Sequence, residues 1–170
     1  MRESAGFETP ATPWLDRLDA VRERLRALSD AKPIPGSLTS ADPDSGERWD
    51  WGQVWAHVRE FPDYWMNQIE AALAAPPDPP PSFGRVRTDP GRVSAIEAER
   101  RTPVPMLWSS IDAQLLRLRR ELETFTAQEW ELRVRHATLG ILDMPGILER
   151  FLVGHLEEHA TQLAALASTP

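Results

Sequence analysis

The sequence predicts an all-α protein, a four-helix bundle whose helices are joined by long crossover-type loops. Four segments place apolar residues at the three- and four-residue spacing of an amphipathic helix, and they span residues 14–30, 51–73, 106–125 and 144–167. No segment shows the strict alternation or the β-branched richness of a strand. A chain of 170 residues is long enough to bury a sizeable core. Four amphipathic helices bury their apolar faces by packing together, which is the architecture of a bundle.

The first two predicted helices begin at recognisable start signals. Pro13 stands just before the first, a position where proline is favourable. Asp50 and Gln53 have the spacing of a capping box at the start of the second. The apolar face of the first helix consists of Trp14, Leu18, Val21, Leu25 and Leu28. The apolar face of the second consists of Val54, Val58, Phe61, Trp65, Ile69 and Leu73.

The last two predicted helices follow the same rule. Asp143 and Pro145 mark the start of the fourth. The third helix carries Leu107, Ile111, Leu115, Leu118, Leu122 and Phe125 on its apolar face. The corresponding stripe on the fourth is Leu148, Leu152, His155, His159, Leu163 and Leu166.

The connections define the rest of the chain. Residues 31–49 and 75–91 are too long for tight turns between antiparallel neighbours, and the second is so rich in proline that we expect a stiff extended cover. We expect a short polar helix at 94–101, a capped helical turn from Thr126 to Glu129, and a turn at Gly140. The predicted organisation is a flexible N-terminal tail over residues 1–12 and a single four-helix-bundle domain over 13–168.

Composition and charge exclude several functional classes. The chain has no cysteine, so disulfides, thiolate metal ligands and cysteine nucleophiles are excluded. A net charge of −7 without a basic run argues against nucleic acid as a partner. No run approaches the roughly 18 to 20 apolar residues of a membrane span, and the N-terminus lacks the apolar region of a signal peptide. We therefore expect a cytoplasmic protein. Lys32 is the only lysine, and this preference for arginine suggests a GC-rich bacterial genome.

Three histidines are predicted to face the bundle core. His155 and His159 are four residues apart, so their imidazoles lie on one helix face, one turn apart. His57 lies three residues after Val54 and four before Phe61, on the inward face of the second helix. Histidine nitrogens from two helices can converge on one ion at about 2.0–2.1 Å. The sequence therefore predicts a shared metal site, with three separately hydrogen-bonded core histidines as the alternative.

Residues next to metal ligands should orient the imidazole rings. Glu60, three residues after His57, and Gln162, three residues after His159, are candidates for this role. Glu60 could instead be a solvated charge near Arg59. Glu158 directly precedes His159 and projects about 100° away around the helix, so we expect it to face solvent or a neighbouring helix.

Two further residues are candidates for a pocket wall. His136 precedes the last helix and is either a pocket residue or a loop histidine that hydrogen-bonds to the backbone. Trp55 belongs to a set of tryptophans that could line a pocket but at helical spacing more often form core. The other members of the set are Trp49, Trp51, Trp65 and Trp108.

Three motifs together resemble a known family. They are "WDWGQVWAHVREFPDYW" around His57, "VRHATLGILDMPGIL" before the last helix, and "LVGHLEEHATQL" within it. The pattern resembles the DinB-like family, also called YfiT-like or DinB/DUF664, of metal-binding four-helix bundles. The metal ligands of that family match His57, His155 and His159 one for one. The long proline-rich loop is the main departure, and it could alter the cover of the site and the substrate.

The resemblance implies a metal-dependent enzyme with a small-molecule substrate. Some relatives are thiol-dependent S-transferases or isomerases that use low-molecular-weight thiols, and the implied activities are S-transferase or hydrolase. Nitrogen ligands without thiolate suit a divalent transition metal such as Zn, Ni, Fe or Mn. The resemblance also implies a homodimer, and a role in stress response is the expectation if the bundle is non-catalytic. Two alternatives stay open, because the sequence identifies no general base: a non-catalytic metal- or small-ligand-binding bundle, and a purely structural bundle.

Overall fold

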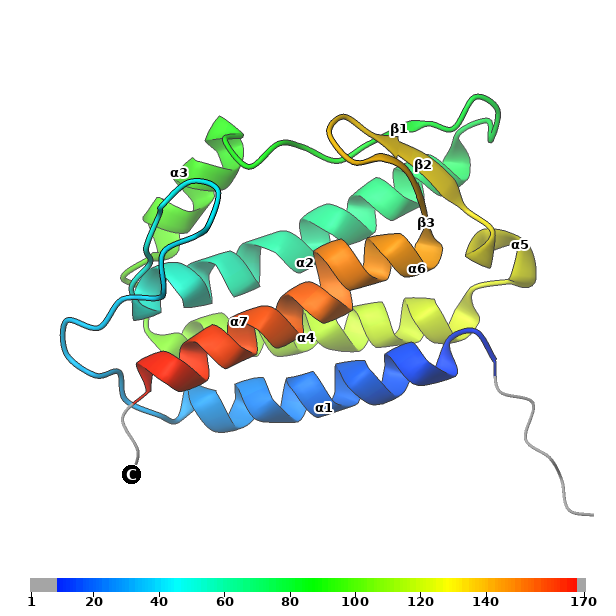
Figure 1. Ribbon diagram of the computed structural model, residues 1–170. Coiled ribbons are helices and arrows are strands. Elements are labelled where there is room, and N and C mark those ends of the chain that lie inside the picture. Colours follow the sequence, from blue (N-terminus) through cyan, green and yellow to red (C-terminus); the bar gives the residue numbers. More distant parts are fainter. Residues whose placement is uncertain (1–8, 168–170) are drawn as a thin grey trace, which may run out of the picture.

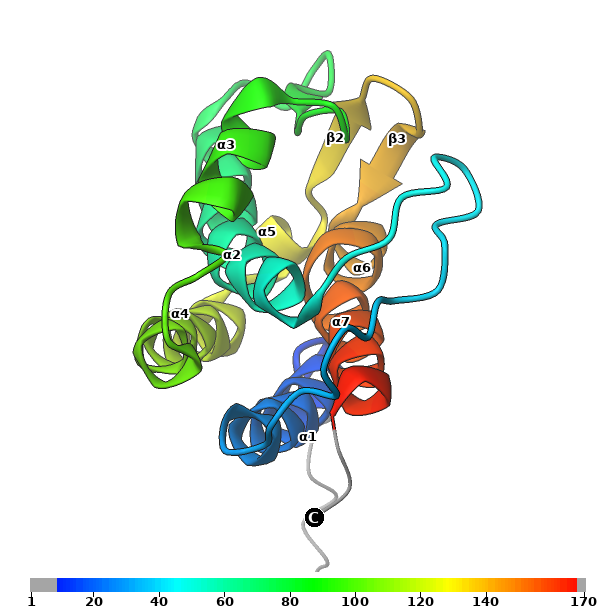
Figure 2. The same cartoon turned by 90° about the vertical axis from the view of Figure 1, so that its left-hand side faces the viewer.

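The computed structural model describes residues 9–167 and confirms the helical-bundle fold class. The four long helices are α1 (Thr12–Ser29), α2 (Trp51–Ala74), α4 (Val104–Thr124) and α7 (Val153–Leu166) (Figure 1). α1 packs against α4 and α7, and α2 packs against the same two helices, so α1 and α2 lie at opposite corners of the bundle (Figure 2). The loop over residues 30–50 makes this diagonal crossing at one end of the bundle, which is the crossover that its length predicts.

The core is formed by the four predicted apolar faces. Leu18, Phe61, Ile111 and Leu152 come from four different parts of the chain, and each is completely buried. Trp14, Leu28, Leu73 and Phe125, at the ends of the predicted faces, are partly buried against this core. Within the described residues, no helix is both long and apolar enough to cross a membrane.

Both predicted capping boxes are present. The Asp50 side chain accepts a hydrogen bond from the backbone N–H of Gln53 at 2.9 Å, and Gln53 Oε1 accepts from the backbone N–H of Asp50 at 3.0 Å. Thr126 and Glu129 make the equivalent pair at the start of the short helix α5 (Ala127–Trp130). Each box satisfies backbone donors that a helix start leaves unpaired.

A small sheet corrects the expectation that the chain has no strands. β1 (Ser82–Phe83) pairs in parallel with β2 (Arg133–His136), which pairs antiparallel with β3 (Gly140–Asp143). Gly140 has a φ of +74°, in the left-handed region that glycine adopts readily, so the predicted turn at Gly140 is the end of a hairpin. Strands of two to four residues are too short to produce a period-two signal.

The proline-rich linker therefore covers one end of the bundle through strand pairing. After β1 the chain enters α3 (Pro90–Glu99), which packs on α2. The polar helix that was predicted at 94–101 therefore begins four residues earlier, at Pro90. Asp89 accepts a hydrogen bond from the backbone N–H of Arg92 at 2.9 Å and caps the helix, and Pro90 occupies its first position.

The fourth predicted helix is helical over its length, from Met144 to Leu166, but it is not α-helical throughout. Its first turn is α6 (Met144–Ile147), which is followed by a π-helical turn over Leu148–Leu152 and then by α7. The backbone N–H of Val153 donates to the carbonyl of Leu148, five residues earlier. A π turn holds one residue more than an α turn, and such turns often occur at functional sites.

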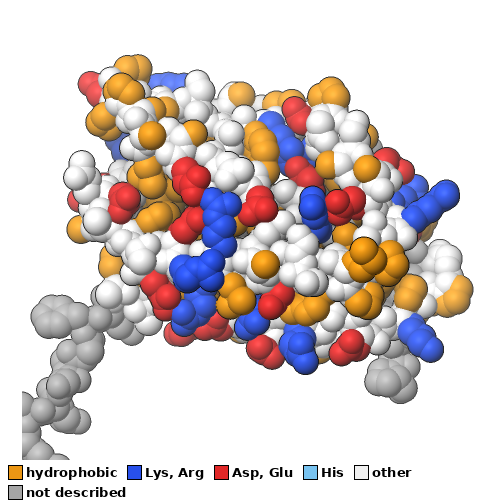
Figure 3. Space-filling view, turned by 180° about the vertical axis from the view of Figure 1, so that it is seen from behind, with side chains coloured by type: hydrophobic (Ala, Val, Ile, Leu, Met, Phe, Trp, Pro, Cys, Tyr) orange, Lys and Arg blue, Asp and Glu red, His pale blue; other side chains and the backbone are white. Residues whose placement is uncertain are grey.

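The exterior of the bundle is mixed in charge. On the face opposite to the view of Figure 1, arginine and acidic side chains are interleaved (Figure 3). One such group joins α2 to α4, where Arg117 forms ion pairs with Asp63, Glu70 and Glu121. Exposed pairs of this kind contribute little stability individually.

Candidate metal centre

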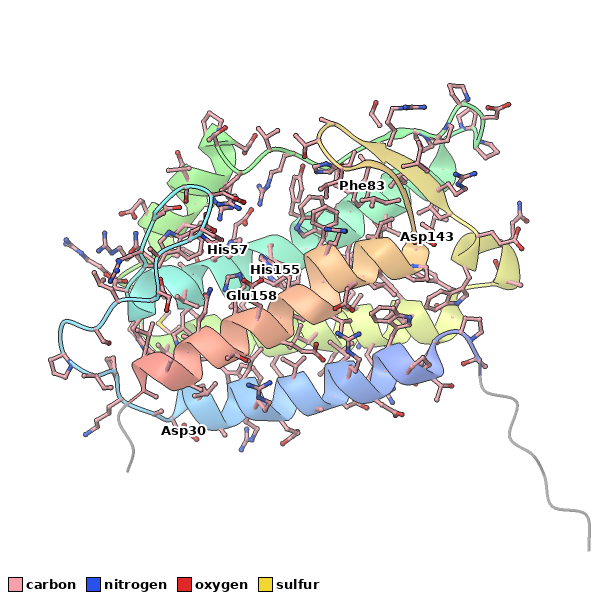
Figure 4. All side chains as sticks on the ribbon, in the orientation of Figure 1. Asp30, His57, Phe83, Asp143, His155 and Glu158 are labelled. Carbon is pink, nitrogen blue, oxygen red and sulfur yellow. The ribbon has the colours of Figure 1, made fainter. Side chains whose placement is uncertain are left out.

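Three histidine side chains meet between α2 and α7. His57 comes from α2 and His155 from α7 (Figure 4). His159 lies one turn after His155 on α7. The Nε2 atoms of His57 and His155 are 3.1 Å apart, and those of His155 and His159 are 3.0 Å apart. One nitrogen from each residue lies within 4.8 Å of the other two. The structure thus brings together the three histidines that the sequence places on inward faces, and we call them the histidine triad.

Each triad histidine faces an oxygen acceptor three residues further along its own helix. The pairs are His57 Nδ1 with Glu60 Oε2 at 3.7 Å, His155 Nδ1 with Glu158 Oε2 at 3.3 Å, and His159 Nδ1 with Gln162 Oε1 at 2.8 Å. A carboxylate or amide oxygen only accepts, so these partners favour a proton on Nδ1. The Nε2 lone pairs are then directed at one another.

This convergence fits a bound cation. Imidazole nitrogens about 2.0–2.1 Å from one ion in tetrahedral or octahedral geometry lie about 2.9–3.4 Å from each other. The two Nε2 separations given above, 3.1 and 3.0 Å, fall within that range. In addition, His57 Nδ1 and Glu60 Oε2 are buried without a hydrogen bond in the structure. With a cation on Nε2, His57 would carry its proton on Nδ1, which faces Glu60 Oε2 at 3.7 Å.

Burial keeps two of the imidazoles neutral. Burial, with smaller effects from the other two triad rings, places the pKa of His57 well below its ordinary value of 6.5. Burial and the neighbouring His155 lower the pKa of His159 to about 3. Both rings are therefore unprotonated at neutral pH, which is the state in which a histidine binds a metal.

Aromatic side chains surround the triad and restrict its rings. The Trp49 ring is stacked on His159, with 6.2 Å between centroids, and meets His57 edge-on at 5.1 Å. Phe61 packs against His155 at 4.8 Å. These contacts hold the imidazoles in the orientation that the triad requires.

Two cavities open onto the triad. The first, of about 350 Å³, lies under the loop of residues 39–49, and we call it the loop-side cavity. The second, of about 360 Å³, lies between the segment of residues 85–92 and the β2–β3 hairpin, and we call it the hairpin-side cavity. His57, His155, Arg87 and Arg92 line both cavities, so the triad can be approached from either side.

Glu60 and Gln162 both lie beside their predicted histidines. The amide oxygen of Gln162 is within hydrogen-bond distance of His159, as given above. Glu60 forms an ion pair with Arg85, which is itself largely buried and lies 3.8 Å over the ring of Tyr64. Glu60 is therefore not the solvated charge near Arg59 that was the alternative.

His136 and Trp55 lie in different surroundings. His136 lines the hairpin-side cavity, and its Nδ1 also accepts backbone N–H groups of Thr138 and Leu139, both at 3.3 Å. It therefore combines the two roles between which the sequence left a choice. Trp55 is completely buried, packs edge-on against Trp51 at 5.9 Å and lines neither cavity, so it belongs to the core.

Sequence reasoning missed the contact of Glu158 with the triad and the position of Arg92 beside it. Glu158 is 63% exposed, as expected, but its carboxylate also reaches His155, and this contact lowers the pKa of Glu158. The same i, i+3 spacing that singled out Glu60 and Gln162 would have found it. Arg92 carries no such signal, because it reaches the triad from α3, a helix that the sequence places only approximately.

The comparisons with known proteins bear on the fold. No family model matches this sequence, and no curated protein matches it. One solved structure is similar over 98% of this chain and 90% of its own, with a TM-score of 0.69 and 20% sequence identity. It is YfiT from Bacillus subtilis, described as a probable metal-dependent hydrolase with an unusual four-helix bundle topology. The resemblance inferred from the three motifs is thereby confirmed at the level of the fold, and the chain has the YfiT-like, DinB-type four-helix-bundle fold.

Proposed function

We propose that this protein is a metal-dependent enzyme that binds one divalent transition metal through His57, His155 and His159 and acts on a small molecule. The observation that carries the proposal is the arrangement of the triad, in which His155 Nε2 lies 3.1 Å from His57 Nε2 and 3.0 Å from His159 Nε2. Each Nδ1 faces its own acceptor three residues downstream. Core histidines that only fill space would not need this common pattern.

Hydrolysis is the activity that we favour. When bound by three neutral imidazoles, a divalent ion keeps positions for water and substrate and supplies Lewis-acid chemistry. The similar fold of YfiT, described as a probable metal-dependent hydrolase, supports the same choice. Zinc, nickel, iron and manganese all suit the nitrogen ligands.

The protein must also accept a proton from an attacking water. Three carboxylates line the loop-side cavity: Asp42, Glu47 and Glu158. Asp42 pairs with Arg87 and Glu158 contacts His155. Glu47 has no side-chain partner among the described residues, so it is our candidate for the proton acceptor.

A thiol-dependent S-transferase is the second candidate. The supporting observation is that two cavities of similar volume meet at the triad. Such an arrangement offers one side for a low-molecular-weight thiol and the other for an electrophile. A metal-binding module without turnover is distinguished from both enzymes only by assay.

The first test is the metal content of the untagged protein, purified without chelator and measured by elemental analysis. We expect about one equivalent of a transition metal in the wild type and little in His57→Ala or His155→Ala, because two imidazoles hold an ion far less tightly than three. His136→Ala is the matched control, since this fourth histidine lies outside the triad. Equal metal content in the wild type and the triad variants would contradict the ligand set.

The second test asks for turnover. The metal-loaded protein is assayed with chromogenic esters and amides, and separately with a thiol and an aryl halide. Hydrolysis that is lost in His57→Ala supports the favoured activity, and thiol conjugation that is lost in the same variant supports the second candidate. Metal binding without either reaction favours the non-catalytic module.

A further inference from the structure

The hairpin-side cavity has an unusual charge. Among the residues that the structure describes, its lining includes four arginines and no carboxylate, although the whole chain has a net charge of −7. The four are Arg85, Arg87, Arg92 and Arg150. By contrast, acidic and basic side chains are interleaved on the face of Figure 3. A cavity lined by one sign of charge attracts ligands of the opposite sign.

Two of these arginines are already neutralised. Arg85 pairs with Glu60, and its Nη1 lies 3.9 Å from Asp89 Oδ1. Arg87 pairs with Asp42, and its Nη2 lies 3.6 Å from Asp44 Oδ2. These two side chains are held in place by the protein, so they shape the cavity more than they bind an anion.

Within residues 9–167, no carboxylate lies at ion-pair distance from either of the other two arginines, but Arg150 is exposed to solvent and has no further contact that fixes it, unlike Arg92. The guanidinium of Arg92 is half-buried, lies 5.1 Å over the Trp49 ring and donates one hydrogen bond, to the carbonyl of Arg87 at 3.1 Å. Burial lowers the pKa of Arg92, with Glu60 and Glu47 opposing the effect from a distance. Most N–H groups of a partly desolvated, always charged side chain are thus left for a ligand.

The remaining wall of this cavity is aromatic and apolar. The ring of Phe151 stacks on Trp65 with 4.2 Å between centroids and on His136 with 5.3 Å. Val86 and Leu139 line the same cavity and are 46% and 43% exposed. A flat apolar group can lie against such a wall while a charged group on the same molecule reaches Arg92.

We infer that the hairpin-side cavity is the substrate subsite and that it takes a small carboxylate with an aromatic or similarly flat apolar part. The carboxylate binds the planar guanidinium of Arg92, for which two parallel N–H···O bonds are the favoured geometry. The flat part lies against Trp65 and Phe151, and the reacting end faces His57 and His155. The last statement rests on the proposed function, whereas carboxylate binding by Arg92 does not.

The test is calorimetric titration of the full chain, loaded with one equivalent of zinc. The probes are benzoate, benzamide, which has the same ring without the charge, and acetate, which has the charge without the ring. We expect benzoate to bind more tightly than either of the other two. Arg92→Gln should weaken benzoate binding on the order of tenfold to a hundredfold, the range for a lost charge-assisted hydrogen-bond pair. The benzoate affinity of Arg92→Lys should lie between those of the wild type and Arg92→Gln, because lysine keeps the positive charge but cannot donate two parallel N–H···O bonds.

Arg26→Gln is the matched control, because it removes one charge from α1, which does not line the cavity. Benzoate affinity equal in wild type and Arg92→Gln, or no benzoate binding by the wild type at tens of millimolar, would overturn the inference. Acetate binding as tight as benzoate binding would contradict the proposed contribution of the aromatic and apolar wall to affinity. If the protein holds no zinc, the proposed function fails, and the same titrations on the protein as purified still decide the carboxylate subsite.

Discussion

At the scale of single residues, the triad depends on acceptors that orient its rings. An imidazole binds a metal through one nitrogen only if the other carries the proton, and an acceptor at Nδ1 enforces that tautomer. Gln162 makes the shortest of these contacts, at 2.8 Å from His159. Its carbonyl oxygen is neutral, so it orients the ring without adding charge to the site.

Gln162→Leu should therefore weaken metal binding while leaving the three ligands in place. Loss of an orienting partner of this kind typically costs about tenfold to a hundredfold in metal affinity. Competition of the purified variant with a chromophoric chelator measures the change. Gln128→Leu, at an exposed position on α5, is the control and should bind metal like the wild type. Unchanged affinity in Gln162→Leu would mean that this contact does not support the ligand.

At the scale of elements, the π-helical turn before α7 sets which residues of that helix face the triad. One extra residue in a turn rotates the following helix by about 100° relative to a continuous α-helix. The backbone is closely packed at Gly154, where the chain leaves the π-helical turn directly before His155. A Cβ on Gly154 would lie 2.2 Å from the backbone oxygen of Glu149, which cannot move aside as a side chain could.

We predict that Gly154→Ala destabilises the protein by about 1–3 kcal/mol, as overpacking against rigid atoms usually does. Because the displaced backbone carries His155, the variant should also lose metal affinity. Urea unfolding and metal titration measure the two effects. Gly91→Ala is the control: its Cβ would meet only the Asp89 side chain, at 3.1 Å, so its stability should stay within about 1 kcal/mol of the wild type. A Gly154→Ala protein as stable as the wild type would show that the turn relaxes without cost.

At the scale of the whole molecule, the crossover topology places the site under two long loops. Because α1 and α2 occupy opposite corners, the connection between them passes over one end of the bundle, next to the triad. Arg87 in the second long connection pairs with Asp42 and Asp44 in the first, so the two loops are tied together over the site. The two loops and both helices thereby form one unit around the histidine triad.

Metal removal should lower the thermal stability of the entire domain. A ligand at 100 times its dissociation constant stabilises the folded state by about 2.7 kcal/mol. For a chain of this size, that corresponds to a fall in Tm of roughly 5–10 °C after chelation. Differential scanning calorimetry with and without chelator gives the value. His57→Ala should show almost no shift on chelation, and an equally large shift in that variant would place the stabilising metal elsewhere.

Much of this protein can be predicted from local sequence patterns. The four apolar stripes and the two capping boxes are properties of neighbouring residues, so the helices and their inward faces follow from spacing alone. For the same reason the spacing of His155 and His159, and the place of His57 between Val54 and Phe61, predict which histidines meet.

The remaining features depend on residues that are distant in the sequence. β1 pairs with a strand about 50 residues later, and strands of two to four residues leave no periodic signal. Arg92 reaches the triad from another helix, and only the folded chain shows that no carboxylate within the described residues pairs with it. Trp55 and Trp49 look alike in sequence, but packing puts one in the core and the other on the wall of the site. The sequence by itself determined the bundle and the candidate ligands, because both follow from helical periodicity. Only the tertiary structure decided the sheet, the two cavities and the charge of the hairpin-side cavity, because these arise from contacts between distant segments.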